Sequence, residues 1–459
     1  MEYPKLLNHY KNKSFSIFII STMLLSILPI FFYFSLSNFS GFGFIIVNSQ
    51  VILNMQKLSL LSLILGLLMP FAILISSIFS GLKRNFIANI FPILTNFIIY
   101  GLVLYFIFLA ILFAYTFFAF LNEIAGLRII FIIIGFAITV AMLTAVPPIT
   151  KGISHFVKSS PIMVVGVSLN EKDHAKIFSL INQISTKINA KKPKNITIGL
   201  TPDFYATSAN VRIFNGVEEK LLKDETLYIS LPYLRVLTIK EFEGIVGHEL
   251  GHFEGDDTLY SLKFAPIYRR LNEQFRSLDE DETKESILIK LAVYPIIFLF
   301  NEFSRKEEKI SKEQELKADI FGAKASGDAK IFINGLAKLY IYGLVWDEVE
   351  NGYREVVRQK VKTKIENLSK EFISHARKNL DKKKLLEFLE HIADYQQKHP
   401  NDTHPPFKER MKNLNVKLDE MTNKSLMNFL PSSASLIPNI DVIEENMTLV
   451  LTEIEKSRS

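Results

Sequence analysis

The chain has 459 residues, of which 49% are hydrophobic and none is cysteine. This composition excludes an intrinsically disordered chain, and the length exceeds that of one typical domain. The absence of cysteine excludes disulfides, a cysteine nucleophile and thiolate-ligated metals, so any metal must be held by histidines and carboxylates. The net charge of +6 would by itself fit a nucleic-acid or acidic-lipid partner.

The charge is distributed unevenly along the chain. Residues 1–150 carry seven basic and two acidic side chains, a net charge of +5, so the remaining residues are nearly neutral. The charge excess therefore lies in the part of the chain with the fewest charged residues. Because no strongly basic region remains outside this part, we expect no nucleic-acid partner.

The first third of the chain contains long stretches without any charged residue. A helix needs about 20 apolar residues to cross the hydrocarbon core of a membrane. We therefore predict that residues 1–150 form a membrane anchor. The anchor would contain about four transmembrane helices, near residues 15–37, 58–82, 98–121 and 127–147.

The connections between these helices predict their orientation. Three lysines precede the first helix, Lys83 and Arg84 separate the second from the third, and two lysines follow the fourth. Each of the other two connections holds a single basic residue. The positive-inside rule then places the N-terminus and the chain from residue 151 onward in the cytoplasm.

The chain after residue 151 has a mixed α and β pattern. Residues 161–168 fit a strand, residues 171–189 have the apolar spacing of a helix, and residues 195–237 are rich in short β-branched runs. Thr238, followed three residues later by Glu241, matches the capping box that starts many helices. We therefore predict that a helix begins just after Thr238.

That helix carries the sequence His248-Glu249-Leu250-Gly251-His252. Histidines at positions i and i+4 lie on one face of a helix, so both imidazoles can bind one tetrahedral zinc ion. Glu249 is suited to act as the general base toward a zinc-activated water. The structural alternative is a helix with two solvated histidines.

A catalytic zinc ion needs a third protein ligand. A helix predicted over about residues 304–325 carries Glu315 and Asp319 one turn apart, so both can face the same site. Glu315 as ligand and Asp319 as support for a ligand form a coherent pair. On spacing alone Glu308 and Glu313 compete for the ligand role, and the segment could also be a solvated charged face.

A third group of polar residues begins at His404, which precedes two prolines, and ends at Arg410. The prolines fit the first turn of a helix. His404 could donate a hydrogen bond to the oxyanion of a tetrahedral intermediate, and Arg410 could pair with a buried carboxylate. Without other information, an ordinary surface helix is the simpler interpretation of these residues.

A multi-helix membrane anchor followed in order by these three motifs resembles the membrane zinc metallopeptidases of the HtpX heat-shock protease and CAAX prenyl protease type, which are gluzincins. The resemblance covers roughly residues 195–415, and the order of three separated motifs makes it specific. Four membrane helices are fewer than in the CAAX prenyl protease branch. A quality-control or processing protease of a bacterial-type inner (cytoplasmic) membrane therefore fits the sequence better.

The resemblance implies a role for each motif residue. Glu249 would be the general base and acid, Asp319 would support a ligand histidine or pair with Arg410, and His404 would lie near the oxyanion of the scissile carbonyl. A strand around residues 205–214 would be the edge strand that binds a polypeptide substrate by β-addition. One Zn2+ ion per chain would be bound by three ligands: His248, His252 and Glu315.

The expected fold class is α+β, mainly α, with an N-terminal transmembrane helix bundle followed by a gluzincin-type zinc metallopeptidase domain that contains a small β-sheet. After the anchor, we expect a cytoplasmic metallopeptidase domain over residues 151–420 and a C-terminal tail with a short helix over residues 421–459. The chain would be a multi-pass membrane protein whose partners are the lipid bilayer and a polypeptide substrate.

Residues 286–300 are apolar except for Lys290, but they are too few for a comfortable membrane span. His252 and Glu315 must reach one metal, so the chain between them cannot cross the membrane an odd number of times. We therefore predict a buried or membrane-surface helix on the cytoplasmic face. A core helix of the catalytic domain is an equal alternative.

Two classes of function are compatible with the sequence. The first is a zinc-dependent membrane endopeptidase that hydrolyses membrane-associated or misfolded proteins by zinc-activated water, with Glu249 as general base. The second is a non-catalytic membrane binding or regulatory protein with a relic metal site; a CAAX-type processing protease is a further alternative. The intact Glu249 favours the enzyme, because a relic site would be free to lose its base.

Overall fold

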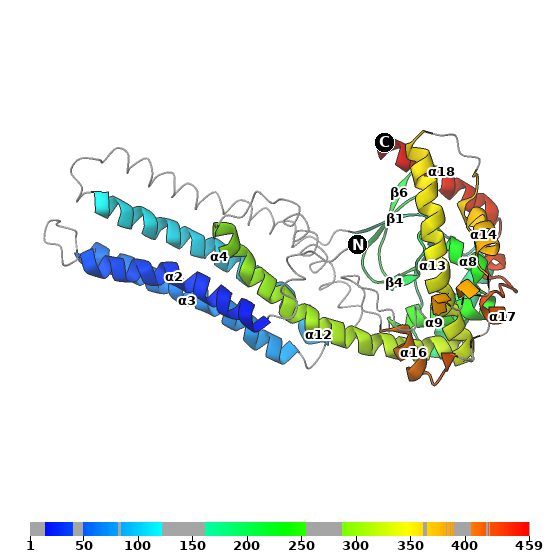
Figure 1. Ribbon diagram of the computed structural model, residues 1–459, viewed down its shortest axis with the longest axis horizontal. Coiled ribbons are helices and arrows are strands. Elements are labelled where there is room, and N and C mark those ends of the chain that lie inside the picture. The colour runs from blue at the N-terminus through cyan, green and yellow to red at the C-terminus, as the bar shows by residue number, and fades with distance from the viewer. Residues whose placement is uncertain are drawn as a thin grey trace. The chain divides into compact units, whose positions relative to one another are not determined.

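The computed structural model describes the chain in separate segments, and its contacts divide the chain into two compact units. The first unit holds residues 1–159, 263–309 and 399–401, and the second holds residues 160–262, 310–398 and 402–459. Figure 1 labels many of the elements of both. The described segments are residues 14–39, 49–80, 84–121, 161–253, 287–360, 365–381, 383–385, 387–389, 405–418, 421 and 423–458.

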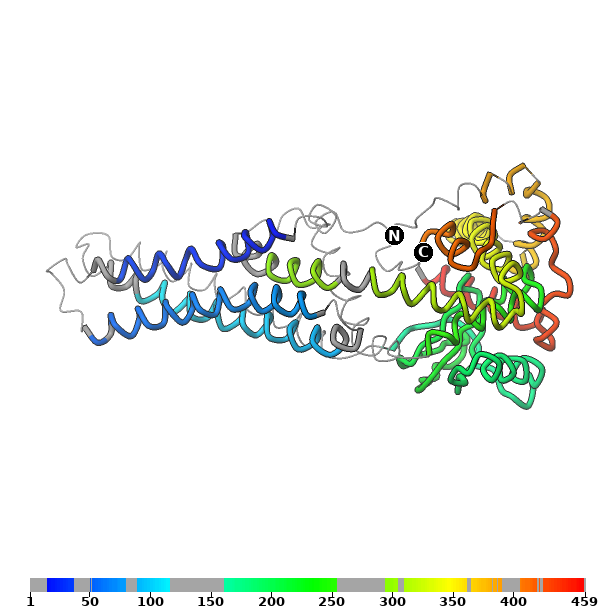
Figure 2. Tube along the Cα trace, turned by 90° about the horizontal axis from the view of Figure 1, so that it is seen from below, coloured from blue at the N-terminus to red at the C-terminus, as the bar shows by residue number. Residues whose placement is uncertain are grey.

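Three long helices form the main part of the first unit and run alongside one another (Figure 2). All three are long and apolar enough to cross a membrane. The third begins at Arg84 rather than near residue 98, because Pro92 is accommodated inside the helix instead of starting a new one. The fourth predicted helix, near residues 127–147, lies outside the described residues. The three are α2 (Ser14–Phe39), α3 (Ser49–Ser80) and α4 (Arg84–Leu121).

Small and hydroxyl-bearing residues hold these helices together. A Cβ atom added at Gly66 of α3 would lie 2.7 Å from the Leu25 carbonyl oxygen of α2, so the two backbones approach closely. The Tyr105 hydroxyl of α4 donates to the same oxygen at 2.9 Å. This pattern of small residues and interhelical hydrogen bonds is typical of helix packing within a lipid bilayer.

The first part of α12 (Ile287–Ser326) also belongs to this unit. Its Phe298 ring lies 5.6 Å from the Phe18 ring of α2, and its Glu302 carboxylate accepts a hydrogen bond of 2.5 Å from Ser77 of α3. The apolar segment predicted at 286–300, described from Ile287 on, is therefore helical and packs against the apolar helices. The helix predicted over 304–325 is the second part of the same continuous helix, which also accommodates Pro295 in its first part.

The second unit contains two small sheets. The first has the strand order β1-β5-β6, with β1 and β5 parallel, and the second has the order β2-β3-β7-β4. The strand expected around residues 205–214 is two strands in different sheets, of which β4 lies at an edge. The strands are β1 (Ile162–Val165), β2 (Val167–Ser168), β3 (Asn195–Gly199), β4 (Tyr205–Thr207), β5 (Val211–Phe214), β6 (Glu219–Leu222) and β7 (Thr226–Ser230).

The helices share one hydrophobic core with the second sheet, whereas the first sheet has a small core of its own, which Tyr228 of β7 completes. At the centre of the shared core, Trp346 of α13 is fully buried and lies 5.5 Å from the Phe372 ring of α14. Residues 421–459, predicted as a tail, belong to this unit, since α18 packs against α13. The helices are α7 (Ala175–Ile188), α8 (Leu231–Val236), α9 (Ile239–Gly251), the second part of α12, α13 (Ala329–Arg358), α14 (Leu368–Asn379), α16 (Phe407–Asn413), α17 (Asn423–Leu426), the 3-10 helix η2 (Ser433–Leu436) and α18 (Ile440–Arg458).

The expected fold class is confirmed: the chain is α+β and mainly α, with apolar helices at the N-terminus and small sheets in the second unit.

Candidate metal centre

Helix α9 begins where the sequence predicts. The Thr238 hydroxyl accepts a hydrogen bond from the Glu241 backbone N–H at 3.3 Å, and the Glu241 carboxylate accepts one from the Thr238 N–H at 2.8 Å. Both halves of the capping box are therefore present. The helix ends at Gly251, which places His248 and His252 in its last turn and at its C-cap.

Glycines on α9 allow this helix to approach α12 closely. A Cβ atom at Gly247 would lie 2.2 Å from the Ala325 Cβ atom, and one at Gly251 would lie 2.9 Å from the Phe321 ring. Side chains larger than hydrogen at these positions would separate the two helices. The close contact brings Glu315, on α12, to the end of α9 that carries the histidines.

Two imidazoles and one carboxylate converge between these helices. The Nε2 atoms of His248 and His252 each lie 3.4 Å from an oxygen of Glu315. All three groups offer ligand atoms within 4.8 Å of one another. In a tetrahedral site with bonds of about 2.1 Å, ligand atoms are separated by about 3.4 Å, so this donor set fits a zinc ion.

The burial of the acidic residues distinguishes among the candidates for the third ligand. Glu315 is buried and faces the histidines, whereas Glu313 is exposed on the same helix. The Glu308 side chain lies outside the described residues. The Glu249 carboxylate lies 3.9 Å from the His248 Nε2 atom and remains partly exposed. Glu249 is therefore beside the ligand cluster and open to solvent.

A buried ion pair supports His248 from behind. The Asp319 carboxylate lies 3.1 Å from the His248 Nδ1 atom and accepts hydrogen bonds from the Arg410 guanidinium at 3.0 and 2.5 Å. Arg410 and Asp319 are 2% and 0% exposed, so neither charge is solvated. An Nδ1 atom that donates to a carboxylate leaves Nε2 free to bind a metal.

This network shifts the pKa values of its members. Burial alone would lower the pKa of His248, but hydrogen bonds to Asp319 and Glu315 outweigh burial and raise the pKa to about 9. Burial alone would raise the pKa of Asp319, but the charge of Arg410 and the hydrogen bonds from Arg410 and His248 lower it. Without a metal ion, the two carboxylates therefore favour the positively charged form of His248.

Sequence reasoning missed two aromatic neighbours of this centre. The Phe332 ring of α13 stacks on the His248 ring, with centroids 5.9 Å apart, and the Tyr340 hydroxyl lies 3.4 Å from the Arg410 guanidinium. The spacing of apolar residues in α13 could identify Phe332 as a core residue, but no local pattern connects it with a histidine 84 positions earlier. His404 lies outside the described residues, so nothing places it at the centre.

Comparison with known proteins agrees with this geometry. Residues 172–417, more than half of the chain, match the family described as Peptidase family M48. The chain belongs to peptidase family M48. The match includes the whole ligand cluster and its supporting ion pair, so the cluster lies inside the part of the chain that the family shares.

Several curated proteins named protease HtpX homolog are similar to this M48 chain. The protein from Gemmatimonas aurantiaca is 24% identical over 37% of the chain and 58% of its own length. The protein from Archaeoglobus fulgidus is 20% identical over 39% of the chain and 51% of its own length. That from Burkholderia ambifaria is 23% identical over 48% of the chain and 76% of its own length.

The chain thus spans little more than half the length of the first two of these relatives. No solved structure is significantly similar to the chain. The relatives and the three apolar helices together indicate a multi-pass membrane protein of the HtpX type.

Proposed function

We propose that this chain is a zinc-dependent membrane endopeptidase. The observation that carries the proposal is the convergence of His248, His252 and Glu315 beside the partly exposed Glu249. Three protein ligands with a carboxylate next to them fit a catalytic zinc site, whereas a structural site is usually closed by four protein ligands. The proposal includes one Zn2+ ion per chain.

The ion, when bound, would polarise a water molecule and the substrate carbonyl and would lower the pKa of that water toward about 7. Glu249 accepts the proton of the attacking water and passes it to the nitrogen of the leaving amine. Asp319 keeps the proton of His248 on Nδ1, so that Nε2 stays a lone-pair donor. Arg410 holds the Asp319 carboxylate in its charged form and in a fixed orientation.

The edge strand β4 is the proposed binding site for the polypeptide substrate. β4 pairs with β7 on one side, and no other described strand pairs with its second side. Phe204, which precedes β4, packs against Phe242 of α9 with ring centroids 6.2 Å apart. A substrate strand added to β4 would therefore run next to the helix that carries Glu249.

The proposed substrates are membrane-associated or misfolded proteins, and the proposed location is a bacterial-type inner membrane with the catalytic unit in the cytoplasm. The apolar helices and the basic residues that flank them support this orientation. Single cysteines introduced into the cysteine-free chain test it by labelling from either side of the membrane. If a cysteine at position 158 is labelled only from the outer face, the proposed orientation is wrong.

Glu249→Gln tests the mechanism. The variant should retain zinc but lose peptide cleavage by about 10²–10⁴-fold, because glutamine cannot accept the proton. Glu243→Gln, on the same helix but outside the ligand cluster, is the matched control and should keep its activity, because Glu243 pairs with Lys240 rather than with the histidines. Unchanged cleavage by purified, zinc-loaded Glu249→Gln would contradict the mechanism. If the native chain binds zinc but cleaves no peptide, a non-catalytic binding protein would be favoured.

A second pair of variants tests the third ligand. Glu315→Gln should lose zinc in metal analysis, whereas Glu313→Gln should not, because only the first faces the histidines. The two substitutions remove the same charge from the same helix, so a difference between them reports on the ligand role. Equal zinc content in both variants would exclude Glu315 as the third ligand.

A further inference from the structure

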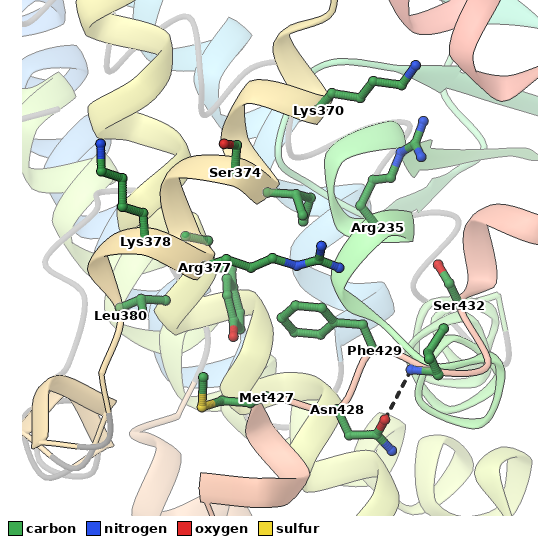
Figure 3. A pocket seen from close by; sticks show the side chains of 14 residues that line it. Arg235, Lys370, Ser374, Arg377, Lys378, Leu380, Met427, Asn428, Phe429 and Ser432 are labelled. Carbon is green, nitrogen blue, oxygen red and sulfur yellow. Dashed lines mark hydrogen bonds between the residues drawn. The ribbon is translucent and has the colours of Figure 1, made fainter.

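A separate pocket lies in the second unit, between α8, α14 and residues 427–432 (Figure 3). Its volume is about 860 Å³, within the range of small-molecule binding sites. None of the metal-centre residues is among those that line it. The proposed peptidase chemistry therefore does not explain this pocket.

The charged groups of the pocket are all basic. The described lining residues include no aspartate or glutamate, and the four basic ones are Arg235, Lys370, Arg377 and Lys378. Figure 3 shows the Arg377 guanidinium reaching into the pocket beside the Phe429 ring, whereas Lys378 points away. Arg377 is exposed and has no ion-pair partner among the described residues. It is thus available to bind an anion.

Arg235 is held in place by residues outside the pocket. Its Nε atom donates to Glu444 of α18 at 3.0 Å, and its Nη2 atom donates to Glu444 and Asp441. The donors on Nη1 remain unused by any described group. An arginine fixed in this way loses little entropy when it binds a further acceptor. Lys370 is paired with Asp441 at 2.8 Å and lies 3.9 Å from Glu445, so its charge is already balanced outside the pocket.

The opposite wall of the pocket is apolar and aromatic. The Phe429 and Tyr342 rings meet edge to face with centroids 5.5 Å apart, and Leu380 and Met427 extend the same wall. An anion alone would leave this wall in contact with water. A ligand that carries an apolar or aromatic body next to its anionic group would cover both parts of the pocket.

Hydrogen bonds fix the segment that forms this wall. Lys338 donates to the Asn428 carbonyl oxygen at 2.5 Å, and the Ile239 N–H of α9 donates to the Pro431 carbonyl oxygen at 2.9 Å. Ser433 N–H donates to the Leu237 carbonyl oxygen at 3.0 Å. The wall is therefore formed before a ligand binds, which reduces the entropic cost of binding.

We propose that this pocket binds a phosphate monoester with an apolar or aromatic body. A phosphate monoester carries a charge of about −1.5 to −2 at neutral pH and three acceptor oxygens, so it can accept from the Arg377 guanidinium and from the Nη1 donors of Arg235 at once, which a carboxylate with two oxygens does less well. The Arg377 guanidinium can bind two phosphate oxygens at once and stack on a planar group. The site is independent of the metal centre and of the proposed peptidase activity.

Calorimetric titration of the full-length protein tests this proposal, with phenyl phosphate as the probe and a fixed ionic strength. Phenyl phosphate should bind more tightly than inorganic phosphate, which lacks the ring, and than benzoate, which carries a single negative charge. Arg377→Glu should weaken binding of phenyl phosphate by at least about 10-fold. Arg377→Lys keeps the charge but loses the two-pronged contact, so its affinity should lie between those of the native chain and Arg377→Glu.

Lys176→Glu is the matched control, because it makes the same change in charge at an exposed position of α7, outside the pocket. Its affinity for phenyl phosphate should equal that of the native chain. If Arg377→Glu and Lys176→Glu weaken the binding of phenyl phosphate equally, the ligand responds only to the overall charge of the protein, and the proposal is overturned. Absence of binding, or equal affinity for phenyl phosphate and inorganic phosphate, would overturn it as well.

Discussion

Breaking the buried pair between Asp319 and Arg410 should reveal how strongly it supports the metal centre. Asp319→Asn removes the closest negative partner of the Arg410 guanidinium, which is 2% exposed and otherwise has only Glu315, at 3.9 Å. Removal of one partner from a buried ion pair costs about 3–5 kcal/mol, a large part of a typical stability of about 5–15 kcal/mol. Arg410→Met should cost less, because Asp319 keeps its contact with His248 at 3.1 Å.

The double variant Asp319→Asn/Arg410→Met isolates the interaction energy between the two side chains. Because neither charge is then left unpaired, the free energy of unfolding of the double variant should exceed the value expected from adding the losses of the two single variants. The hydrogen bonds of 3.0 and 2.5 Å within the pair predict a coupling of about 2 kcal/mol or more. In zinc binding, Asp319→Asn should lose about 10–100-fold in affinity, because His248 loses the acceptor that orients its ring.

Urea unfolding followed by tryptophan fluorescence is a suitable assay. The chain has a single tryptophan, Trp346, which is fully buried in α13, so the signal reports on the second unit alone. Lys456→Met is the matched control, because its 2.8 Å ion pair with Glu453 is exposed and should contribute less than about 1 kcal/mol. Single effects as small as the control, or a double effect equal to the sum of the single effects, would refute the reasoning.

Three further substitutions test packing, capping and pH dependence. Gly247→Ala should destabilise the second unit by about 1–3 kcal/mol and lower its zinc content, because α9 must move away from α12; Gly352→Ala, with no atom within 4 Å of its new Cβ, should not. Thr238→Ala should cost about 1 kcal/mol in urea unfolding, through the lost cap of α9, and a neutral result would show that the capping box is dispensable. Burial alone would raise the pKa of Glu455, but two arginines of α13 lower it. The charged Glu455 therefore stabilises the fold fully above the unfolded pKa of about 4.3, and this stabilisation is lost as the pH falls through the lower pKa of the folded state. Glu455→Gln should therefore be less stable than the native chain at pH 7, with the difference decreasing below about pH 4, and a difference independent of pH would contradict this assignment.

The sequence predicted those features that depend on neighbours a few positions apart. The apolar stretches indicated membrane helices, and the structure has three helices long and apolar enough to cross a membrane. The pair Thr238 and Glu241 predicted the start of α9, which the structure confirms. The spacing of His248 and His252 placed both on one helical face. Such patterns are reliable because helix geometry fixes the relation between residues i, i+3 and i+4, whatever the rest of the chain does.

The sequence was less informative about the limits and partners of longer elements. It predicted a helix over 304–325 and an apolar segment before it, which in the structure are one helix, α12. It also predicted one strand over 205–214, where the structure has two strands in different sheets. Neither result follows from local propensity, because the packing of remote elements decides whether a helix continues or a strand changes sheet.

By itself, then, the sequence determined a membrane anchor, a helix with two histidines around a glutamate, and the absence of thiolate ligands. The tertiary structure decided which carboxylate meets those histidines, since Glu315 is buried among them and Glu313 is not. It also joined Arg410 to Asp319 across 91 positions. The contact of Glu315 with the histidines depends on two helices that touch at Gly247 and Ala325, and close packing between remote segments is a property of the folded chain that no local spacing encodes.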